Sequence, residues 1–354
     1  MDRRREDGIG LDELAQATRN HGMPLEALRA DITPAGMHYV LIHYDVPFLD
    51  PASHRLSFRG FERSLDVGLD ELRARPGVTL PVTFECAGNG RALFESRPVS
   101  QPWLLEAVGT AAWTGTPLSG LLRDAGVPGG TVEIVFTGSD RGVEGDEEQW
   151  YERSLPIDEA MRDDVLLVYA MNGQPLPPQH GGPIRLLVPG WYGMTNVKWL
   201  ARITASPRSH DGYQSVVGYR LRTDPDEPGE PVSRMRVRSL MAPPGIPSFP
   251  ERERVLAAAP TTLEGRAWSG TAPIARVEVS VDGCASWAEA RLEPSPAPSA
   301  WHRWTFEWTA TPGVHELACR ATDADGATQP LEPEPNLGGY ANNAVHRVRV
   351  TVTG

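Results

Sequence analysis

Cys86 lies in a sequence context in which its thiol could bind a metal. Cys86 follows an apolar and β-branched run, Leu80 to Phe84, that predicts a strand. A Gly88-Asn89-Gly90 turn comes next, and these residue types accept the positive φ angles with which backbone folds closely around a bound group. A thiolate is a soft, polarisable ligand that suits a redox metal. The alternative is a buried structural cysteine, since free cysteine is among the most buried residue types.

Lys198 is a second residue that the composition singles out. Of the 34 basic residues, Lys198 is the one lysine and the rest are arginine. A compact, flexible ammonium is therefore a candidate for a position where a planar guanidinium would not fit. Chance survival of one lysine is the alternative.

Three loop segments carry further candidates. His180 opens a His-Gly-Gly-Pro loop, whose glycines let backbone approach a ligand closely. Arg19-Asn20-His21 stands at the end of a helical pattern, where a solvated loop is the alternative. Gly218-Tyr219-Arg220 places a tyrosine in a loop, and an ordinary exposed tyrosine would explain it equally.

Strands and short helices must position these residues. Residues 11–30 read as helical around Gly22 and Pro24, and Tyr39 to Val46 reads as a strand. Asp164 to Met171 predicts a buried strand that ends in an Asn-Gly turn. Other predicted elements are a strand at 56–60, a short helix at 69–75 and a helix face at 118–122.

The charge and the cysteine count exclude several classes of protein. A net charge of −12, spread along the chain, disfavours nucleic acid and anionic membrane as partners. Cys86, Cys284 and Cys319 form neither a Cys-x-x-Cys-His haem site nor a disulfide framework. No apolar run is long enough for a membrane span, and Arg3-Arg4-Arg5 lacks the apolar stretch of an export signal. The chain as written is therefore predicted to be cytoplasmic, and an exported protein from which a signal peptide has been removed is the alternative.

The segment from Glu85 to Arg91, Glu-Cys-Ala-Gly-Asn-x-Arg, resembles the molybdenum-cofactor segment of the sulfite oxidase family. That family also includes the molybdenum domain of assimilatory nitrate reductases. Other segments resemble the family in the same order along the chain; they are Arg19-Asn20-His21, Pro102-Trp103, 109–115, 176–190 and 196–200.

The resemblance assigns roles to residues at the matching positions. It implies that Cys86 is the protein ligand to molybdenum, that Arg19 and Arg91 bind an anionic substrate, and that Tyr219 hydrogen-bonds to it. The residues that it implies contact the molybdopterin and its phosphate are Asn20, His21, His180, Arg185 and Lys198. Basic donors suit a phosphate dianion.

The C-terminal part changes in composition. Proline-rich stretches at 225–231 and 243–250 mark a linker, and alternating patterns such as Val277-x-Val279-x-Val281 follow. They predict an immunoglobulin-like sandwich, and the stretches 265–270 and 342–348 resemble the family's dimerisation domain. The expected fold is therefore α+β, with a molybdenum-cofactor domain at 1–235 and an all-β dimerisation domain at 236–354.

Two departures from the family fall in the substrate pocket. Sulfite oxidases commonly carry a lysine before the Pro-Trp pair, where this chain has Val99-Ser100-Gln101. They also bring an arginine from the C-terminal domain, where this chain reads Asn336-Leu337-Gly338-Gly339. This chain therefore keeps the family's cofactor-binding residues but lacks two of the cationic residues that bind the anionic substrate.

The resemblance implies a haem-free, homodimeric molybdoenzyme that oxidises sulfite to sulfate by oxygen-atom transfer. By the same resemblance, the enzyme is expected to pass electrons to an external acceptor such as a cytochrome. Two alternatives stay open: a reductase of nitrate or of an S- or N-oxide on the same scaffold, and a cofactor-free binding protein built on the β-sandwich.

Overall fold

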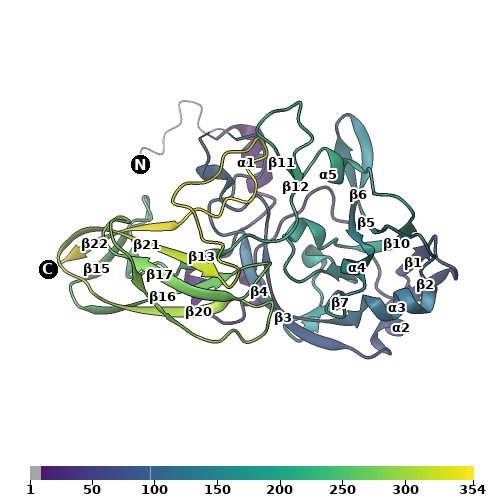
Figure 1. The fold of residues 1–354 in the computed structure, drawn as a ribbon, viewed down its shortest axis with the longest axis horizontal. Helices are drawn as coiled ribbons and strands as arrows, with labels where there is room; N and C mark the ends of the chain where they lie inside the picture. Colours follow the sequence, from purple (N-terminus) through teal and green to yellow (C-terminus); the bar gives the residue numbers. More distant parts are fainter. Residues whose placement is uncertain (1–8, 96) are drawn as a thin grey trace.

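The computed structural model describes residues 9–95 and 97–354, so the Arg3-Arg4-Arg5 run lies outside the described residues. Figure 1 shows a larger N-terminal lobe beside a C-terminal β-sandwich, with the polypeptide crossing between them after β12 (Glu230–Pro231) and before β13 (Arg238–Met241). Strands predominate and the helices are short, in agreement with the predicted α+β class. Among the described residues no helix has the length and apolar character needed to cross a membrane.

Two five-stranded sheets build the N-terminal lobe. The first has the order β2 (Leu65–Gly68), β1 (Arg55–Arg59), β10 (Leu200–Ser206), β5 (Glu133–Glu144) and β6 (Glu147–Pro156). The second has the order β3 (Val78–Glu85), β4 (Val108–Pro117), β7 (Leu166–Met171) and β8 (Gln174–Pro175), with β9 (Arg185–Leu187) paired to β7. All pairs are antiparallel except β1 with β10.

Two helices cover the first sheet and close the main core. Leu72 of α2 (Leu69–Arg73) and Leu118, Leu121 and Leu122 of α3 (Leu118–Ala125) are fully buried in one cluster with Phe136 of β5. The i, i+3, i+4 spacing of the three α3 leucines places them on one face of the helix. The other short helices are α1 (Leu11–Ala17), α4 (Ile157–Ala160) and α5 (Tyr213–Val216).

The C-terminal part folds into two packed sheets. One sheet has the order β13 (Arg238–Met241), β16 (Pro260–Trp268), β20 (His302–Thr309) and β19 (Arg291–Leu292). The other has the order β14 (Ile246–Pro247), β15 (Arg254–Ala257), β22 (His346–Thr353), β21 (Gly313–Asp323), β17 (Ile274–Ser280) and β18 (Ala288–Glu289). Trp304 of the first sheet packs with Val277 and Leu317 of the second in a buried core. The alternating apolar residues thus line the space between the sheets.

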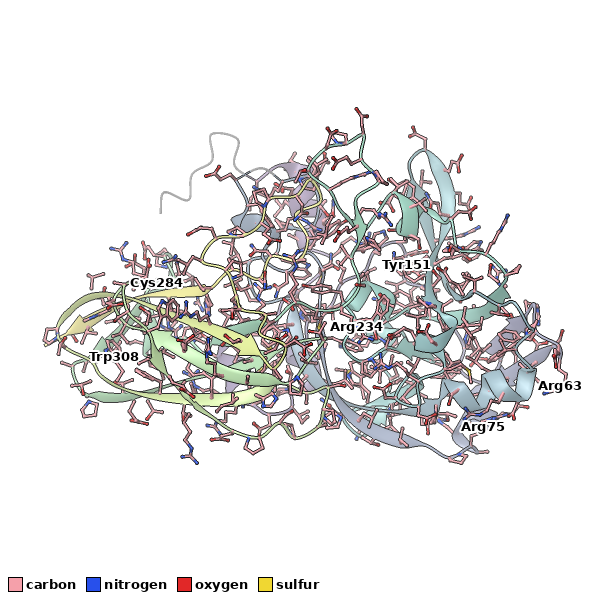
Figure 2. The ribbon with its side chains drawn as sticks, in the orientation of Figure 1. Arg63, Arg75, Tyr151, Arg234, Cys284 and Trp308 are labelled. Atoms are coloured by element: carbon pink, nitrogen blue, oxygen red, sulfur yellow. The ribbon has the colours of Figure 1, made fainter. Side chains whose placement is uncertain are left out.

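Polar contacts join the sandwich to the N-terminal lobe. Arg234 lies between them in Figure 2, and its guanidinium donates to Glu159 Oε1 at 2.5 Å and to Gly270 O at 3.2 Å. A short ladder of β11 (Arg220–Leu221) with β12 (Glu230–Pro231) precedes this crossing. The two lobes therefore meet through specific side chains.

Two predicted elements differ from the structure. The helix expected over 11–30 ends at Ala17, and only a 3₁₀ turn, Leu25–Arg29, follows Pro24. The strand expected from Tyr39 to Val46 forms a single bridge, between Val40 and His21, and is otherwise irregular. Side chains satisfy part of the backbone of this segment instead of a neighbouring strand, since Ile42 N donates to Asn20 Oδ1 and Tyr44 O accepts from Arg19.

Candidate functional site

A cavity opens where the ends of the two N-terminal sheets meet. Its wall includes the ends of β3 and β5, part of β6, and irregular segments from 38–43, 179–180 and 193–198. The lining residues with polar or reactive side chains are His38, Tyr39, His43, Cys86, Asp140, Tyr151, Gln179, His180, Arg185, Asn196, Lys198 and Tyr219. The cavity brings together five sequence-predicted residues, namely Cys86, His180, Arg185, Lys198 and Tyr219.

Cys86 directly follows the last residue of β3 and lies on the cavity wall. Its side chain is buried, its N–H donates to Ala107 O at 2.9 Å, and its carbonyl accepts from Asn89 N at 3.0 Å. Burial raises the pKa of the thiol, and the positive charge of Arg91 and the backbone N–H of Gly88 act in the opposite direction. The donors nearby are therefore arranged to stabilise a thiolate once a cation takes part of its charge.

Lys198 and Asp140 face the same cavity with opposite charges. Lys198 Nζ donates to Leu41 O at 2.7 Å and to Gln179 O at 3.2 Å, and it lies 4.3 Å from the centre of the Trp199 ring. Burial, aided by the charge of Arg185, lowers the pKa of Lys198 to about 7. Burial raises the pKa of Asp140 to about 6, and its Oδ1 has no hydrogen-bond partner.

The partly buried lysine gives a pH-dependent prediction for the cofactor-free protein. Between pH 7 and its ordinary value of 10.5, the unfolded chain holds a proton that the folded chain releases. Folding stability therefore rises with pH across this window. We expect the melting temperature of wild type, relative to Lys198→Met, to increase from pH 7 to pH 10. A difference that does not change with pH would show that Lys198 keeps its proton.

Two neutral imidazoles and one guanidinium form the wall beside the Phe84 side chain. His180 and His38 are buried with ring centres 5.4 Å apart, and the Nε2 atom of each has no partner. Burial lowers the pKa of His38 to about 4 and that of His180 to about 2, so both are neutral at pH 7. Arg185 donates to His180 O at 2.8 Å and to Asn196 O at 2.9 Å, which fixes the His180 loop.

Tyr219 lies on the cavity wall with an ordered hydroxyl. It is buried, hydrogen-bonds to Tyr151, and has a φ of 43°, which is rare for a non-glycine residue. Burial raises the pKa of its hydroxyl, so it stays protonated and can donate a hydrogen bond. Its ring packs on Tyr340 at 5.2 Å between ring centres. Tyr340, which belongs to the C-terminal part of the chain, thus packs against Tyr219 and supports its position.

Arg91 lies beside the cysteine turn and is already engaged. Its guanidinium donates to Gly338 O at 3.0 Å, to Ser100 Oγ at 3.1 Å and to Gln101 O at 3.1 Å. It also lies 5.0 Å from the centre of the Tyr340 ring, and it is not among the residues that line the cavity. A role in binding an anion would require Arg91 to exchange some of these acceptors.

The structure does not place Arg19, Asn20 and His21 at the cavity. Arg19 donates to Tyr44 O at 2.7 Å, and Asn20 accepts from Ile42 N at 2.6 Å, while His21 forms the bridge with Val40. Their polar groups hold the 40–44 segment, and that segment lines the wall. These contacts hold the wall segment, and the role of Arg19, Asn20 and His21 in binding cofactor or anion stays a prediction.

Sequence reasoning missed seven of the polar lining residues, and two of these, His43 and Asp140, left a signal in the sequence. His43 interrupts the apolar run Tyr39 to Val46, and Asp140 follows the buried part of β5 in a Gly-Ser-Asp segment. His38 and Tyr151 left none, because a histidine or tyrosine beside apolar residues is usual in a core. His43 Nε2 hydrogen-bonds to Glu144 Oε2 at 3.2 Å, which connects the wall to the tip of the β5–β6 hairpin.

Comparison with protein families finds two matches that follow one another along the chain. Residues 43–214 match the oxidoreductase molybdopterin binding domain, and residues 232–353 match the Mo-co oxidoreductase dimerisation domain. Cys86 and the other cavity residues from His43 to Lys198 fall within the first match.

Curated relatives resemble most of this chain. A sulfite oxidase of Gallus gallus is 34% identical, with 96% of this chain and 77% of that protein covered. The mitochondrial sulfite oxidase of Homo sapiens is 34% identical and covers 91% of this chain, which spans 62% of that protein's length. A nitrate reductase [NADH] of Arabidopsis thaliana is 32% identical, with 91% of this chain and 38% of that protein covered.

One solved structure resembles the whole fold. The sulfane dehydrogenase SoxCD from Paracoccus pantotrophus matches with a TM-score of 0.81 and 27% sequence identity, covering 94% of this chain and 86% of that chain. The likeness extends over both the N-terminal lobe and the sandwich.

Proposed function

This chain belongs to the sulfite oxidase family, and from that premise we propose that it is a molybdenum-cofactor oxidoreductase. The observation that carries the proposal is the buried Cys86 sulfur on the wall of a cavity lined by polar groups without partners. A cofactor-free binding protein would have no use for these buried donors and acceptors, each of which costs free energy when unsatisfied.

The residues of the cavity fit the molybdopterin cofactor chemically. The thiolate of Cys86 would be the metal ligand, and the unpartnered Nε2 atoms of His180 and His38 would hydrogen-bond to the pterin or phosphate. Lys198 would neutralise part of the phosphate charge, which in turn would favour its protonated form. When bound, the cofactor supplies oxygen-atom transfer and a two-electron redox change.

We propose sulfite as the first substrate to test. Tyr219 is protonated and would donate a hydrogen bond to a substrate oxygen, and Arg91 supplies positive charge beside Cys86. Initial rates with sulfite and an artificial electron acceptor, measured with sulfate production, test the proposal. Sulfate formed in proportion to reduced acceptor supports it, and the absence of sulfate contradicts it.

A reductase acting on an uncharged S- or N-oxide is a second candidate. Among the described residues that line the cavity, Arg185 is the one arginine and Lys198 the one lysine, and both side chains donate to backbone carbonyls. The cavity thus offers little free charge for a dianion. Re-oxidation of the reduced holoenzyme by an S-oxide under anaerobic conditions, with no reduction by sulfite, would favour this candidate.

The sandwich segment at Gly338 gives a prediction about sulfite affinity. A side chain at 338 would overlap the Tyr340 ring, so we expect Gly338→Arg alone to leave the sulfite KM unimproved. Combined with Tyr340→Ala, the arginine should gain a charge-assisted hydrogen bond and lower KM about tenfold relative to Tyr340→Ala alone, which also loses the ring that packs on Tyr219.

Tyr340→Ala alone is the control for this comparison. A KM that falls with Gly338→Arg alone would show that Tyr340 does not block the position. A KM that is unchanged in the double variant would show that position 338 does not reach the substrate.

We also propose that the chain forms a homodimer through the sandwich and passes electrons to an external acceptor. The match of residues 232–353 to a dimerisation domain supports the first part. Light scattering after size-exclusion chromatography tests it, since a monomeric mass at micromolar concentration would contradict the dimer.

A further inference from the structure

The residue before the cysteine, Glu85, is held by the other lobe. Its carboxylate lies at the end of β3 and is buried, with 1% of its side chain exposed. Oε1 accepts from Arg238 Nη1 at 2.5 Å, and Oε2 accepts from Trp268 Nε1 at 2.8 Å. Arg238 and Trp268 belong to β13 and β16 of the sandwich.

The same carboxylate is tied to the cysteine turn. Asn89 Nδ2 donates to Glu85 Oε1 at 3.1 Å, and Asn89 Oδ1 accepts from Ala107 N at 3.1 Å. Asn89 N donates to Cys86 O at 3.0 Å, so the turn closes on the cysteine itself. Arg238 Nη1 also approaches Asn89 O at 3.4 Å. Arg238 therefore contacts residues on both sides of Cys86.

A second part of the sandwich holds the backbone of the turn. Ala341 N donates to Ala87 O at 2.8 Å, and Asn342 Nδ2 donates to Gly90 O at 2.9 Å. Arg91 Nε donates to Gly338 O at 3.0 Å. The approach at Gly90 is close, because a Cβ there would come within 2.9 Å of the Asn342 amide.

We propose that the sandwich positions the Cys86 sulfur, through Arg238 and Trp268 on Glu85 and through the 338–342 segment on the turn, so that the thiol site is complete only when the lobes are docked. The proposal rests on the proposed function only for the use of Cys86 as a ligand, and it holds for either substrate. Glu85, Arg238 and Trp268 are positioning residues, since they act through Cys86.

Contact between the two lobes would not by itself require hydrogen bonds to Glu85. Other contacts, such as Arg254 Nη1 with Glu26 Oε1 at 3.0 Å, join the lobes with no connection to the cysteine turn. A buried ion pair is a costly way to gain stability, because desolvation of both charges offsets most of their attraction. Because Glu85 is the residue before Cys86, its pair with Arg238 fixes the position of the cysteine turn. The pair of Glu26 with Arg254 joins the lobes elsewhere and serves as the control.

The test measures the reactivity of the thiol in cofactor-free protein. The variants are Trp268→Phe, which removes one N–H donor and keeps an aromatic ring, and Glu85→Gln, which keeps the shape of the side chain. Glu26→Gln is the matched control. Alkylation of Cys86 by iodoacetamide is followed by peptide mass spectrometry, with Cys284 as an internal reference, and the melting temperature is recorded for each protein.

We expect Cys86 to react at least about fivefold faster in Trp268→Phe than in wild type, because the turn opens locally, and Cys284 to be unchanged. Glu26→Gln should match wild type at Cys86. Molybdenum content after expression with the cofactor should fall about tenfold in Trp268→Phe, as outer-shell changes weaken metal sites. Should Glu85→Gln fail to fold, Trp268→Phe alone decides.

The reactivity of Cys86 separates this inference from the proposed function. If the Cys86 rate in Trp268→Phe equals that in wild type, or rises no more than in Glu26→Gln, the positioning role is overturned. If the rate responds as expected and wild type carries no molybdenum, the positioning role stands and the proposed function fails.

Discussion

Replacing Cys86 with serine is expected to abolish turnover while the fold is retained. A hydroxyl is a harder and far less acidic ligand than a thiol, so it cannot take the place of a thiolate on a redox metal. The side chain is nearly the same size and its surroundings already include donors, so the melting temperature should fall by only a few degrees, as for a change of about 1 kcal/mol. Steady-state rates and metal content, measured on the same preparation, check both parts.

Cys284→Ser is the matched control, because it makes the same change in the sandwich. This thiol is partly buried and outside the cavity. It should leave turnover and molybdenum content at the wild-type level. Full activity in Cys86→Ser would contradict the assignment of Cys86 as the metal ligand.

Lys198→Met is expected to lose most of the bound cofactor. The ammonium is partly buried on the cavity wall, and a neutral methionine cannot balance a phosphate dianion. Losing a charge-assisted interaction of about 1.5–3 kcal/mol should lower cofactor affinity by roughly ten- to a hundredfold. Pterin fluorescence after denaturation measures the occupancy.

The folded state of the cofactor-free protein should tolerate this change. Methionine has the length to fill the same channel, and a buried ammonium is costly to keep charged. Arg202→Met, at an exposed position on the neighbouring β10, is the control for loss of one positive charge. Equal occupancy in Lys198→Met and Arg202→Met would show that the one lysine has no special role.

The sequence was sufficient for the parts of the site that lie in one segment. The Cys86 turn and the His180 to Lys198 stretch each carry their signal in consecutive residues, and both line the cavity. The alternating apolar patterns likewise predicted the two sheets of the sandwich, because each strand buries one face. That the sandwich is immunoglobulin-like, and that the chain divides at 235, stay predictions.

The parts that could not be predicted depend on contacts between distant segments. Arg19 and Asn20 contact the 40–44 backbone through their side chains, which their local sequence does not indicate, and the binding of cofactor or anion by Arg19-Asn20-His21 stays a prediction. The segment from Tyr39 to Val46 does not form the predicted strand, because side chains of Arg19 and Asn20 bond its backbone in place of a neighbouring strand. The hold of Arg238 and Trp268 on Glu85 was not predictable, because nothing local in the sequence pairs residues so far apart.

Elemental analysis of purified wild type, together with pterin fluorescence after denaturation, tests the central claim most directly. The account predicts about one molybdenum atom and one pterin per chain in wild type, and loss of the metal in Cys86→Ser. Wild type that contains neither molybdenum nor pterin, after expression in a host that makes the cofactor, would contradict it.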